Sequence, residues 1–279
     1  MRKIIFIIFV LLSIKASSQK WDLGVLGGIG NYQGDVSRNL KFENSGLAFG
    51  AYARNNISPF IAYRIGLSYT KIAGYDNQYA ENKWRNLSFH TPIIELSNIF
   101  EINFQNFSSD GRLTNKNKTF FAFTGINLFY FNPYTIYNKE KVYLQPLGTE
   151  GQNLLGKDNR YSRMSVSIPF GIGYKYKISS KMYISFEIGF RYSFSDYIDD
   201  VSGSYPDLNL LRAANGDLPA NLSDRSIETE GKYKSEVGMD RGDVHLKDWY
   251  VISGFSLVFQ IPNPVCKYPT RKFKLFLID

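Results

Sequence analysis

Stretches in which every second residue is apolar recur along the chain. In the clearest, KMYISFEIGFRYSF at residues 181–194, the even positions are apolar, whereas the odd positions include Glu187 and Arg191. Because successive side chains of a β-strand point to opposite faces, this stretch predicts a strand with one apolar face and one polar face. Residues 164–178, MSVSIPFGIGYKYKI, alternate in the same way. Only Ser179 and Ser180 separate the two stretches, which predicts a tight hairpin.

Eight alternating stretches can be identified, and the sequence between them has no sustained helical period. They span residues 21–31, 46–55, 60–71, 88–104, 119–131, 164–178, 181–194 and 248–261. Long connections alternate with shorter ones along the chain. Short turns at one end and long loops at the other are typical of outer-membrane barrels. The sequence therefore predicts an all-β fold: an eight-stranded antiparallel transmembrane β-barrel of outer-membrane type, with long extracellular loops and both termini in the periplasm.

In such a barrel the apolar face meets lipid and the polar face lines the interior. Tyr and Phe near the strand ends are expected to form interfacial girdles: Tyr63, Tyr69, Tyr130, Phe131, Tyr174, Tyr192 and Trp249. The predicted inward positions carry charges of both signs: Arg64, Glu95, Glu101, Lys175, Lys177, Glu187 and Arg191. Buried charges persist only when paired, so we interpret these residues as a structural ion-pair network. An ion or proton path would use the same residues, but an eight-stranded barrel is just filled by its side chains, which favours a plugged interior.

The first twenty residues have the features of a secretory signal. A basic start precedes an apolar run over residues 4–12, which is too short to span a bilayer, and cleavage is expected after Ser18. The predicted organisation is a signal peptide at 1–18, an outer-membrane barrel at 19–262 and a periplasmic tail at 263–279. Cleavage lowers the formal net charge from +8 to +5 because it removes three basic residues. Nucleic acid is therefore not an expected partner.

Motifs for catalysis or cofactor binding are weak. The only two histidines, His90 and His245, have no nucleophile signature nearby, so we do not expect an enzyme. GVLGGIGNYQG superficially resembles a dinucleotide loop but lacks the helix that must follow, so neither a cofactor nor a small-molecule substrate is expected. The acidic stretch DYIDD at 196–200 matches no EF-hand spacing. We favour a solvated acidic loop there, with calcium binding at the rim as the alternative. RGD at 241–243 is too short to be informative.

Several longer motifs resemble one known family. They are NYQGD (31–35), FHTPIIELSNIFEINF (89–104), LQPLGTEGQ (144–152), SIPFGIGYKYKI, DYIDDVSGSYPD (196–207), LSDRS (222–226) and DWY (248–250). In this order they resemble the PorG-type barrel proteins of the type IX secretion system in Bacteroidota. The resemblance implies a non-catalytic outer-membrane component that binds the periplasmic ring of a PorK-like lipoprotein and a PorN-like protein. Such a component tethers the ring to the outer membrane.

The expected partners are therefore outer-membrane lipid, the ring lipoprotein and the ring protein, with other outer-membrane translocon subunits as further candidates. The alternative function is a surface adhesion or ligand-binding barrel that acts through its extracellular loops, since these form a large share of the mature chain.

The C-terminal segment PNPVCKYPTRKFKLFLID, residues 262–279, is basic and apolar, and its prolines prevent it from extending the strand ladder. It is expected either to pack loosely under the barrel or to dock a partner. We favour docking because the resemblance requires a periplasmic contact. The predicted partner-binding residues are Cys266, Lys267, Arg271, Lys272, Phe273 and Lys274. Cys266 is the only cysteine, so it is either an intermolecular disulfide partner or an unpaired thiol.

Overall fold

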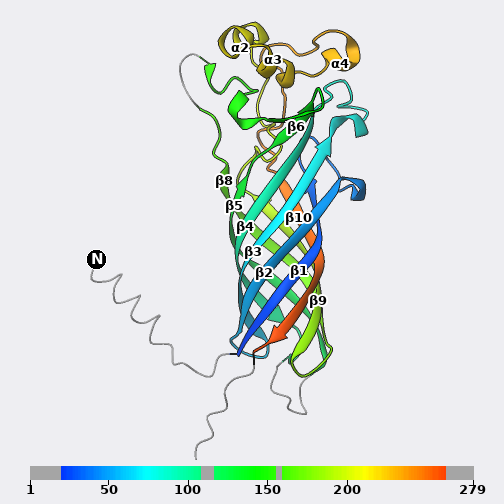
Figure 1. Cartoon of the computed structure of the whole chain (residues 1–279), viewed down its shortest axis with the longest axis vertical. Coiled ribbons are helices and arrows are strands. Elements are labelled where there is room, and N and C mark those ends of the chain that lie inside the picture. The colour runs from blue at the N-terminus through cyan, green and yellow to red at the C-terminus, as the bar shows by residue number, and fades with distance from the viewer. Residues whose placement is uncertain (1–19, 108–115, 155–158, 262–279) are drawn as a thin grey trace, which may run out of the picture.

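The computed structural model describes residues 20–107, 116–154 and 159–261, and it forms a β-barrel that carries loops and short helices at one end (Figure 1). Its eight long strands are β1 (Lys20–Gln33), β2 (Ser45–Asn56), β3 (Ile61–Tyr75), β4 (Ser88–Asn103), β5 (Lys118–Phe131), β8 (Met164–Lys177), β9 (Met182–Ser193) and β10 (Trp249–Gln260). Each contains most of one stretch that alternation predicted. The predicted signal peptide and C-terminal tail lie outside the described residues.

The barrel closes because the two ends of the sheet pair with each other. Around the wall the strand order is β3-β2-β1-β10-β9-β8-β5-β4, every pairing is antiparallel, and β3 pairs with β4. That closing pair extends from Ile61 opposite Ile102 to Tyr75 opposite Ser88. Closure gives each strand two neighbours, so its backbone groups are paired without water, as lipid requires. The predicted eight-stranded antiparallel barrel is confirmed.

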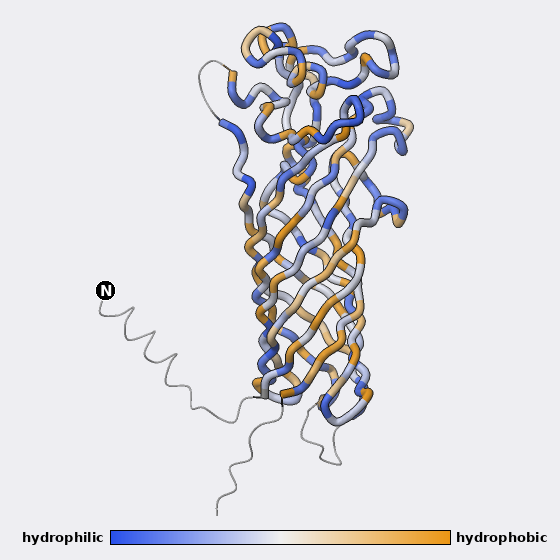
Figure 2. Tube along the Cα trace, in the orientation of Figure 1, coloured by the Kyte–Doolittle hydropathy of each residue, from blue (hydrophilic) through white to orange (hydrophobic). Residues whose placement is uncertain are grey.

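Side chains alternate between the interior and the outer wall. On β9, Ile184 and Ile188 are exposed, whereas Tyr183, Glu187 and Arg191 are buried. Hydrophobic residues recur along the barrel strands, and hydrophilic residues predominate in the loops at the upper end (Figure 2). The apolar face of the wall thus points outward to lipid, and the protein is an outer-membrane β-barrel.

The two ends of the barrel differ in their connections. Residues 57–60 join β2 to β3, residues 104–117 join β4 to β5, and residues 178–181 join β8 to β9, at the end where β1 begins and β10 finishes (Figure 1). We call this the short-turn end. The opposite end, where the other connections are long, is the long-loop end; its exposure to the cell exterior remains a prediction from loop lengths.

A folded layer that we call the loop cap covers the long-loop end. It comprises the described residues of 34–44, 76–87, 132–163 and 194–248. Its regular elements are β6 (Tyr134–Tyr137), β7 (Glu140–Tyr143), α2 (Leu208–Asn215), α3 (Asp217–Ser223), α4 (Ile227–Glu230) and short 3₁₀ turns at Phe42–Asn44, Asp76–Gln78 and Gln145–Leu147. Alternation predicted none of these elements. In the described residues, no helix is both long enough and apolar enough to cross a membrane.

The interior is filled in layers. An apolar cluster below the loop cap includes Tyr32, Phe89, Phe129 and Phe131. Near the short-turn end, the Phe107 ring packs edge-on against Tyr183, with centroids 5.2 Å apart. Buried charged side chains occupy inward-facing positions of the same strands. Together these side chains leave little open volume in the barrel.

One residue assigned to the aromatic girdle was placed wrongly. Phe131 is fully buried, whereas its neighbour Tyr130 is exposed on the outer wall. Adjacent strand residues point to opposite faces, so both could not face lipid. The other six girdle residues are half-buried or exposed: Tyr63, Tyr69, Tyr130, Tyr174, Tyr192 and Trp249.

Candidate functional site

Glu101 on β4 is the centre of a buried charge network inside the barrel. Its Oε2 lies 2.6 Å from Lys175 Nζ and 3.0 Å from Arg54 Nε. Its Oε1 lies 3.2 Å from Arg64 Nε. All four side chains are almost completely removed from solvent. This one carboxylate therefore compensates much of the positive charge of Lys175, Arg54 and Arg64.

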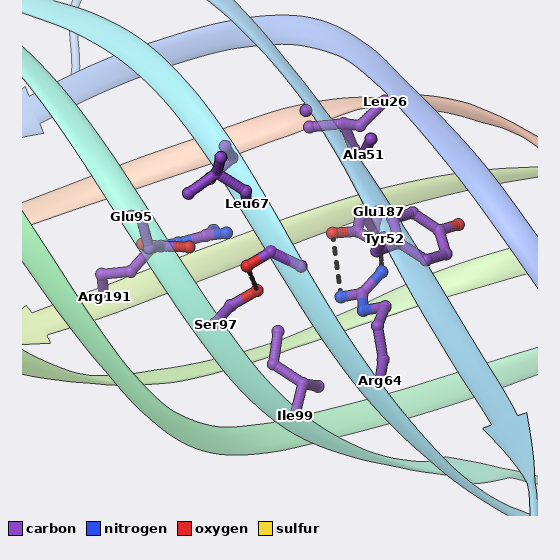
Figure 3. A pocket seen from close by; sticks show the side chains of 13 residues that line it. Leu26, Ala51, Tyr52, Arg64, Leu67, Glu95, Ser97, Ile99, Glu187 and Arg191 are labelled. Carbon is purple, nitrogen blue, oxygen red and sulfur yellow. Dashed lines mark hydrogen bonds and ion pairs between the residues drawn. The ribbon is translucent and has the colours of Figure 1, made fainter.

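Two further contacts join strands across the interior. Arg64 on β3 forms a bidentate pair with Glu187 on β9, at 2.7 Å for Nη1–Oε2 and 3.2 Å for Nη2–Oε1 (Figure 3). Glu95 on β4 accepts a 2.7 Å hydrogen bond from the hydroxyl of Tyr250 on β10 and lies 3.4 Å from Arg191 Nε. The structure thus places all six residues of the predicted network in the interior, each in an ion pair: Arg64, Glu95, Glu101, Lys175, Glu187 and Arg191.

Sequence reasoning missed two members of the network, Asp22 on β1 and Arg54 on β2. Arg54 Nη1 lies 3.3 Å from Asp22 Oδ2 and also donates to the Tyr183 hydroxyl, which in turn donates to Asp22 Oδ2 at 3.1 Å. With these two residues, the eight charges of the network are four cations and four carboxylates. Strand alternation is the sequence signal that could have identified these two residues, because it places both on the inward face of their strands.

Aromatic rings line the cationic side chains. Arg64 Cζ lies 4.8 Å from the centroid of the Tyr52 ring, and Lys175 Nζ lies 4.0 Å from that of Phe121. Gly173 makes room for the Phe121 ring, since a Cβ at this glycine would lie 2.4 Å from ring carbons. Lys177, also predicted to face inward, is half-buried and lies 5.0 Å from the centroid of Phe107.

A cavity of about 30 Å³ remains beside the network, lined by residues that include Glu95, Ser97 and Arg191 (Figure 3). This volume suits one or two water molecules. Ser68 Oγ, a buried atom of a residue that lines this cavity, has no hydrogen-bond partner in the protein. Water in the cavity is a suitable partner for it. The arrangement neutralises charge and braces the wall, with too little space for a substrate.

The predicted partner-binding residues cannot be placed. Cys266, Lys267, Arg271, Lys272, Phe273 and Lys274 all lie outside the described residues. The described chain ends at Ile261, whose backbone N–H donates to the carbonyl of Trp21 at 2.9 Å. Ile261 therefore lies beside the beginning of β1 at the short-turn end.

Two buried arginines join the loops of the cap. Arg85 forms a bidentate pair with Asp76, at 2.7 Å for Nε–Oδ2 and 2.6 Å for Nη2–Oδ1. It also donates to the carbonyl oxygens of Asp35, at 3.0 Å, and Arg241. Three loops, those after β1, β3 and β9, therefore meet at one guanidinium group.

Arg241, the second buried arginine, connects further segments of the loop cap. Its Nε donates to the carbonyl of Ser223 at 3.1 Å, and its Nη1 donates to the carbonyl of Asp200 at 2.5 Å and to Glu150 Oε1 at 3.1 Å. Because Arg241 is buried, the RGD tripeptide is not presented to solvent as a linear motif. It is a structural element of the cap.

The acidic stretch DYIDD is not a solvated loop. Asp196, Asp199 and Asp200 are buried and accept hydrogen bonds from protein groups, so that part of the prediction is wrong. The reason is tertiary: loops far apart in sequence supply the donors. In the described residues, no group of three or more His, Cys, Asp or Glu side chains is arranged to hold a metal ion.

Burial changes the protonation of these acids. The hydroxyl of Tyr32 lies 2.6 Å from both Asp199 Oδ2 and Asp248 Oδ1. The hydroxyl has one proton and can donate it to only one of the two acids, so the other short contact favours a proton on a carboxyl group. Burial acts in the same direction, because it raises the pKa of the carboxyl groups of Asp199 and Asp248 well above the ordinary value for aspartate. Burial also raises the pKa of Asp200 to about 6, against the opposing effects of Arg241 and of the hydroxyls of Thr149 and Tyr161.

A polar cavity of about 660 Å³ opens between the loops of the cap. Its lining includes Asp35, Arg38, Asn82, Asp240 and His245. A cavity of this volume has room for a small ligand.

Comparisons with known proteins identify a family without an assigned function. The profile of the family described as "Domain of unknown function (DUF6089)" matches residues 1–222. No curated protein matches the sequence.

Solved structures with similar folds share little sequence with the chain. The chain is similar to Neisserial surface protein A (8% identity, 88% of this chain and 98% of that one, TM-score 0.38). It is also similar to Ail, the attachment invasion locus protein of Yersinia pestis, in complex with the heparin analogue sucrose octasulfate (7%, 87% and 99%, TM-score 0.39). A third is the outer membrane protein OprG from Pseudomonas aeruginosa (9%, 85% and 95%, TM-score 0.39).

Proposed function

The chain belongs to the DUF6089 family, and we propose that it is a non-catalytic, sealed outer-membrane barrel that tethers a periplasmic ring of a protein-secretion machine to the membrane. The observation that carries the proposal is the interior: paired charges extend from wall to wall and leave a cavity of about 30 Å³. A barrel filled in this way acts through its two ends and its outer wall, because its interior has little space for transport.

The histidines support a non-catalytic role. His90 lies on the outer wall with its ring 5.7 Å from that of Tyr75 and 5.2 Å from that of Tyr134, and His245 is exposed in the loop cap. The interior acids and cations neutralise one another, so none is a free general base with access to a substrate.

The assignment to the type IX secretion system is supported by the resemblance of the loop and strand motifs to PorG-type proteins. In this proposal the short-turn end faces the periplasm and binds the PorK-like lipoprotein and PorN-like protein of the ring. The short turns at 57–60 and 178–181 offer little surface. The segment that follows Ile261 begins at the same end, so the basic and apolar residues from Cys266 to Lys274 are the proposed contact.

The test is recovery of partners from detergent-solubilised outer membranes. The tagged full-length chain should co-purify the ring lipoprotein and ring protein, and a chain truncated after Asn263 should lose them while its barrel still inserts. The matched control replaces Lys118 and Lys181, two exposed lysines at the short-turn end, with Gln and should retain the ring. Absence of ring proteins from the full-length sample would contradict the tethering function. Their retention by the truncated chain would contradict only the tail.

A second candidate function, binding of a surface ligand, is favoured by the ordered loop cap and its cavity of about 660 Å³. Under this alternative, Arg38→Gln with Asp240→Asn should abolish ligand attachment, since both side chains line the cavity. Under the tethering proposal, the same variant should leave ring recovery unchanged. Deletion of 209–234 is a harsher test, because Leu211 and Leu222 in this segment are buried in the cap.

A further inference from the structure

Two lysines share one tyrosine ring on the outer wall near the long-loop end. The Nζ atoms of Lys141 and Lys71 lie 4.0 Å and 5.5 Å from the centroid of the Tyr134 ring. Lys141 Nζ also lies 4.6 Å from the centroid of Tyr143, and the His90 ring packs 5.2 Å from Tyr134. We call these five residues the lysine–tyrosine patch. They come from β3, β4, β6 and β7, so only the folded barrel brings them together.

The patch lies at the border of the lipid-facing band. Along the outward face of β3, apolar and aromatic residues continue from Ile61 to Tyr69, and Lys71 is the next outward residue. Lys71 is ten positions further along the strand than Ile61. At about 3.3 Å per residue and a tilt of about 40°, this corresponds to a height of about 25 Å, the height of the apolar band of an outer-membrane barrel. Lys71 is therefore at the level where lipid headgroups begin.

In the part of the chain that the structure describes, no acidic side chain forms an ion pair with either lysine of the patch. Among the ion pairs of residues 20–107, 116–154 and 159–261, none includes Lys71 or Lys141. The adjacent acid, Glu140, precedes Lys141 in β7, so strand alternation directs it to the opposite face. Elsewhere on the cap surface, Arg38 pairs with Glu81 at 2.6 Å. The two lysines are thus available to an external anion.

A further cation extends the patch along the same rim. Arg163 Cζ lies 5.6 Å from the centroid of Tyr130 on β5. Tyr130 is paired with Ile94 on β4, which is paired in turn with Tyr69 on β3. Lys71 and Arg163 therefore both lie on the long-loop side of this row of outward-facing apolar and aromatic residues.

We propose that the lysine–tyrosine patch binds the phosphate-bearing headgroup of a lipid in the leaflet next to the long-loop end. Two ammonium groups compensate the charge of a phosphate, the tyrosine rings hold the ammonium groups in place, and the exposed residues Ile94 and Leu96 below them contact the acyl chains. A lipid, and not a free anion, fits this position because charge and apolar surface adjoin at the membrane border. This inference does not depend on the secretion role.

The test compares lipids that differ only in phosphate. The full-length protein is reconstituted in phosphatidylcholine nanodiscs that contain diphosphoryl lipid A or its dephosphorylated form, and bound lipid is counted by native mass spectrometry after extraction into detergent. Lys71→Gln with Lys141→Gln should reduce retention of the phosphorylated lipid by roughly tenfold to thirtyfold, since each lysine near a membrane surface contributes about fivefold. Retention of the dephosphorylated lipid should not change.

The controls separate charge at this site from charge in general. Lys118→Gln with Lys181→Gln removes two exposed lysines at the short-turn end and should leave retention at the wild-type level. Lys71→Arg with Lys141→Arg keeps the charge and should also retain the lipid, which distinguishes loss of binding from loss of folding. Equal losses in the Gln variants at the two ends would overturn the proposal. So would displacement of the lipid by an equal concentration of inorganic phosphate, or loss of a co-purifying protein with no loss of lipid.

Discussion

Arg64 and Glu187 form a bidentate ion pair across the full width of the barrel, at 2.7 Å and 3.2 Å. Their strands, β3 and β9, are four steps apart in either direction around the eight-stranded wall, so the two side chains come from opposite sides. Tyr250 and Glu95 make a second contact of this kind, because β10 and β4 are also four steps apart. These cross-barrel contacts occupy the space that a pore would need.

We expect the purified protein to be non-conducting. Single-channel recording in planar bilayers should give no steps comparable to those of a porin, because the interior is filled with paired side chains. A porin sample in the same buffer serves as the control. Regular porin-sized steps that persist after further purification would contradict the description of a sealed barrel.

Replacing Glu101 with Gln should lower the free energy of unfolding by about 3 to 5 kcal/mol, the usual cost of removing one partner from a buried ion pair. The change removes the carboxylate that pairs with Lys175, and it leaves Arg54 and Arg64 with Asp22 and Glu187 as their remaining acidic partners. Urea unfolding in lipid vesicles measures the effect. Glu81→Gln, which breaks a solvent-exposed pair with Arg38, should cost no more than about 1 kcal/mol. Similar effects of the two variants would argue against Glu101 as the centre of the network.

An arginine on the lipid-facing wall should destabilise the barrel according to its depth. Ile188→Arg, in the middle of β9, is expected to cost about 2 to 4 kcal/mol, because a charge near the bilayer midplane loses its hydration. Val237→Arg in the exposed loop cap should be nearly neutral. Folding yields into vesicles, followed by heat-dependent gel mobility, compare the two. If both were tolerated equally, the assignment of inner and outer faces would be wrong.

The loop cap should be more stable at pH 5 than at pH 7.5. Burial raises the pKa values of Asp200 and Asp35 to about 6 in the folded protein, above their ordinary values, so the folded state binds protons more tightly than the unfolded state. As pH falls from 7.5 to 5, proton binding at Asp200 then raises the free energy of unfolding by about 1.4 kcal/mol. Asp224 has a lowered pKa and acts in the opposite direction, but only below its ordinary value of 3.8.

Hydrogen exchange of residues 196–203, corrected for the intrinsic effect of pH on exchange, reports the opening of the cap. Asp200→Asn should weaken the pH dependence, because it removes one of the groups with a raised pKa. Protection that decreases from pH 7.5 to pH 5 would contradict the predicted direction of the effect.

The sequence alone determined the barrel, because strand alternation is a local property that each segment carries by itself. Residues 182–193 already separate a lipid face from a charged face, and the loop lengths predict which turns lie together. The same period identifies Arg64, Glu95, Glu101, Lys175, Glu187 and Arg191 as inward residues. Their pairing could be expected only in general, since an isolated charge inside the barrel would be too costly.

Only the tertiary structure decided which charges pair and what the loops become. Arg64 meets Glu187 because closure places β3 opposite β9, a relationship that depends on all eight strands. DYIDD reads as a polar loop in isolation, yet its carboxylates are buried because donors such as Tyr32 and Thr149 arrive from distant segments. The lysine–tyrosine patch also forms only in the folded protein, because its residues come from β3, β4, β6 and β7. Irregular loops have no period, so their partners are set by long-range packing that the local sequence does not encode.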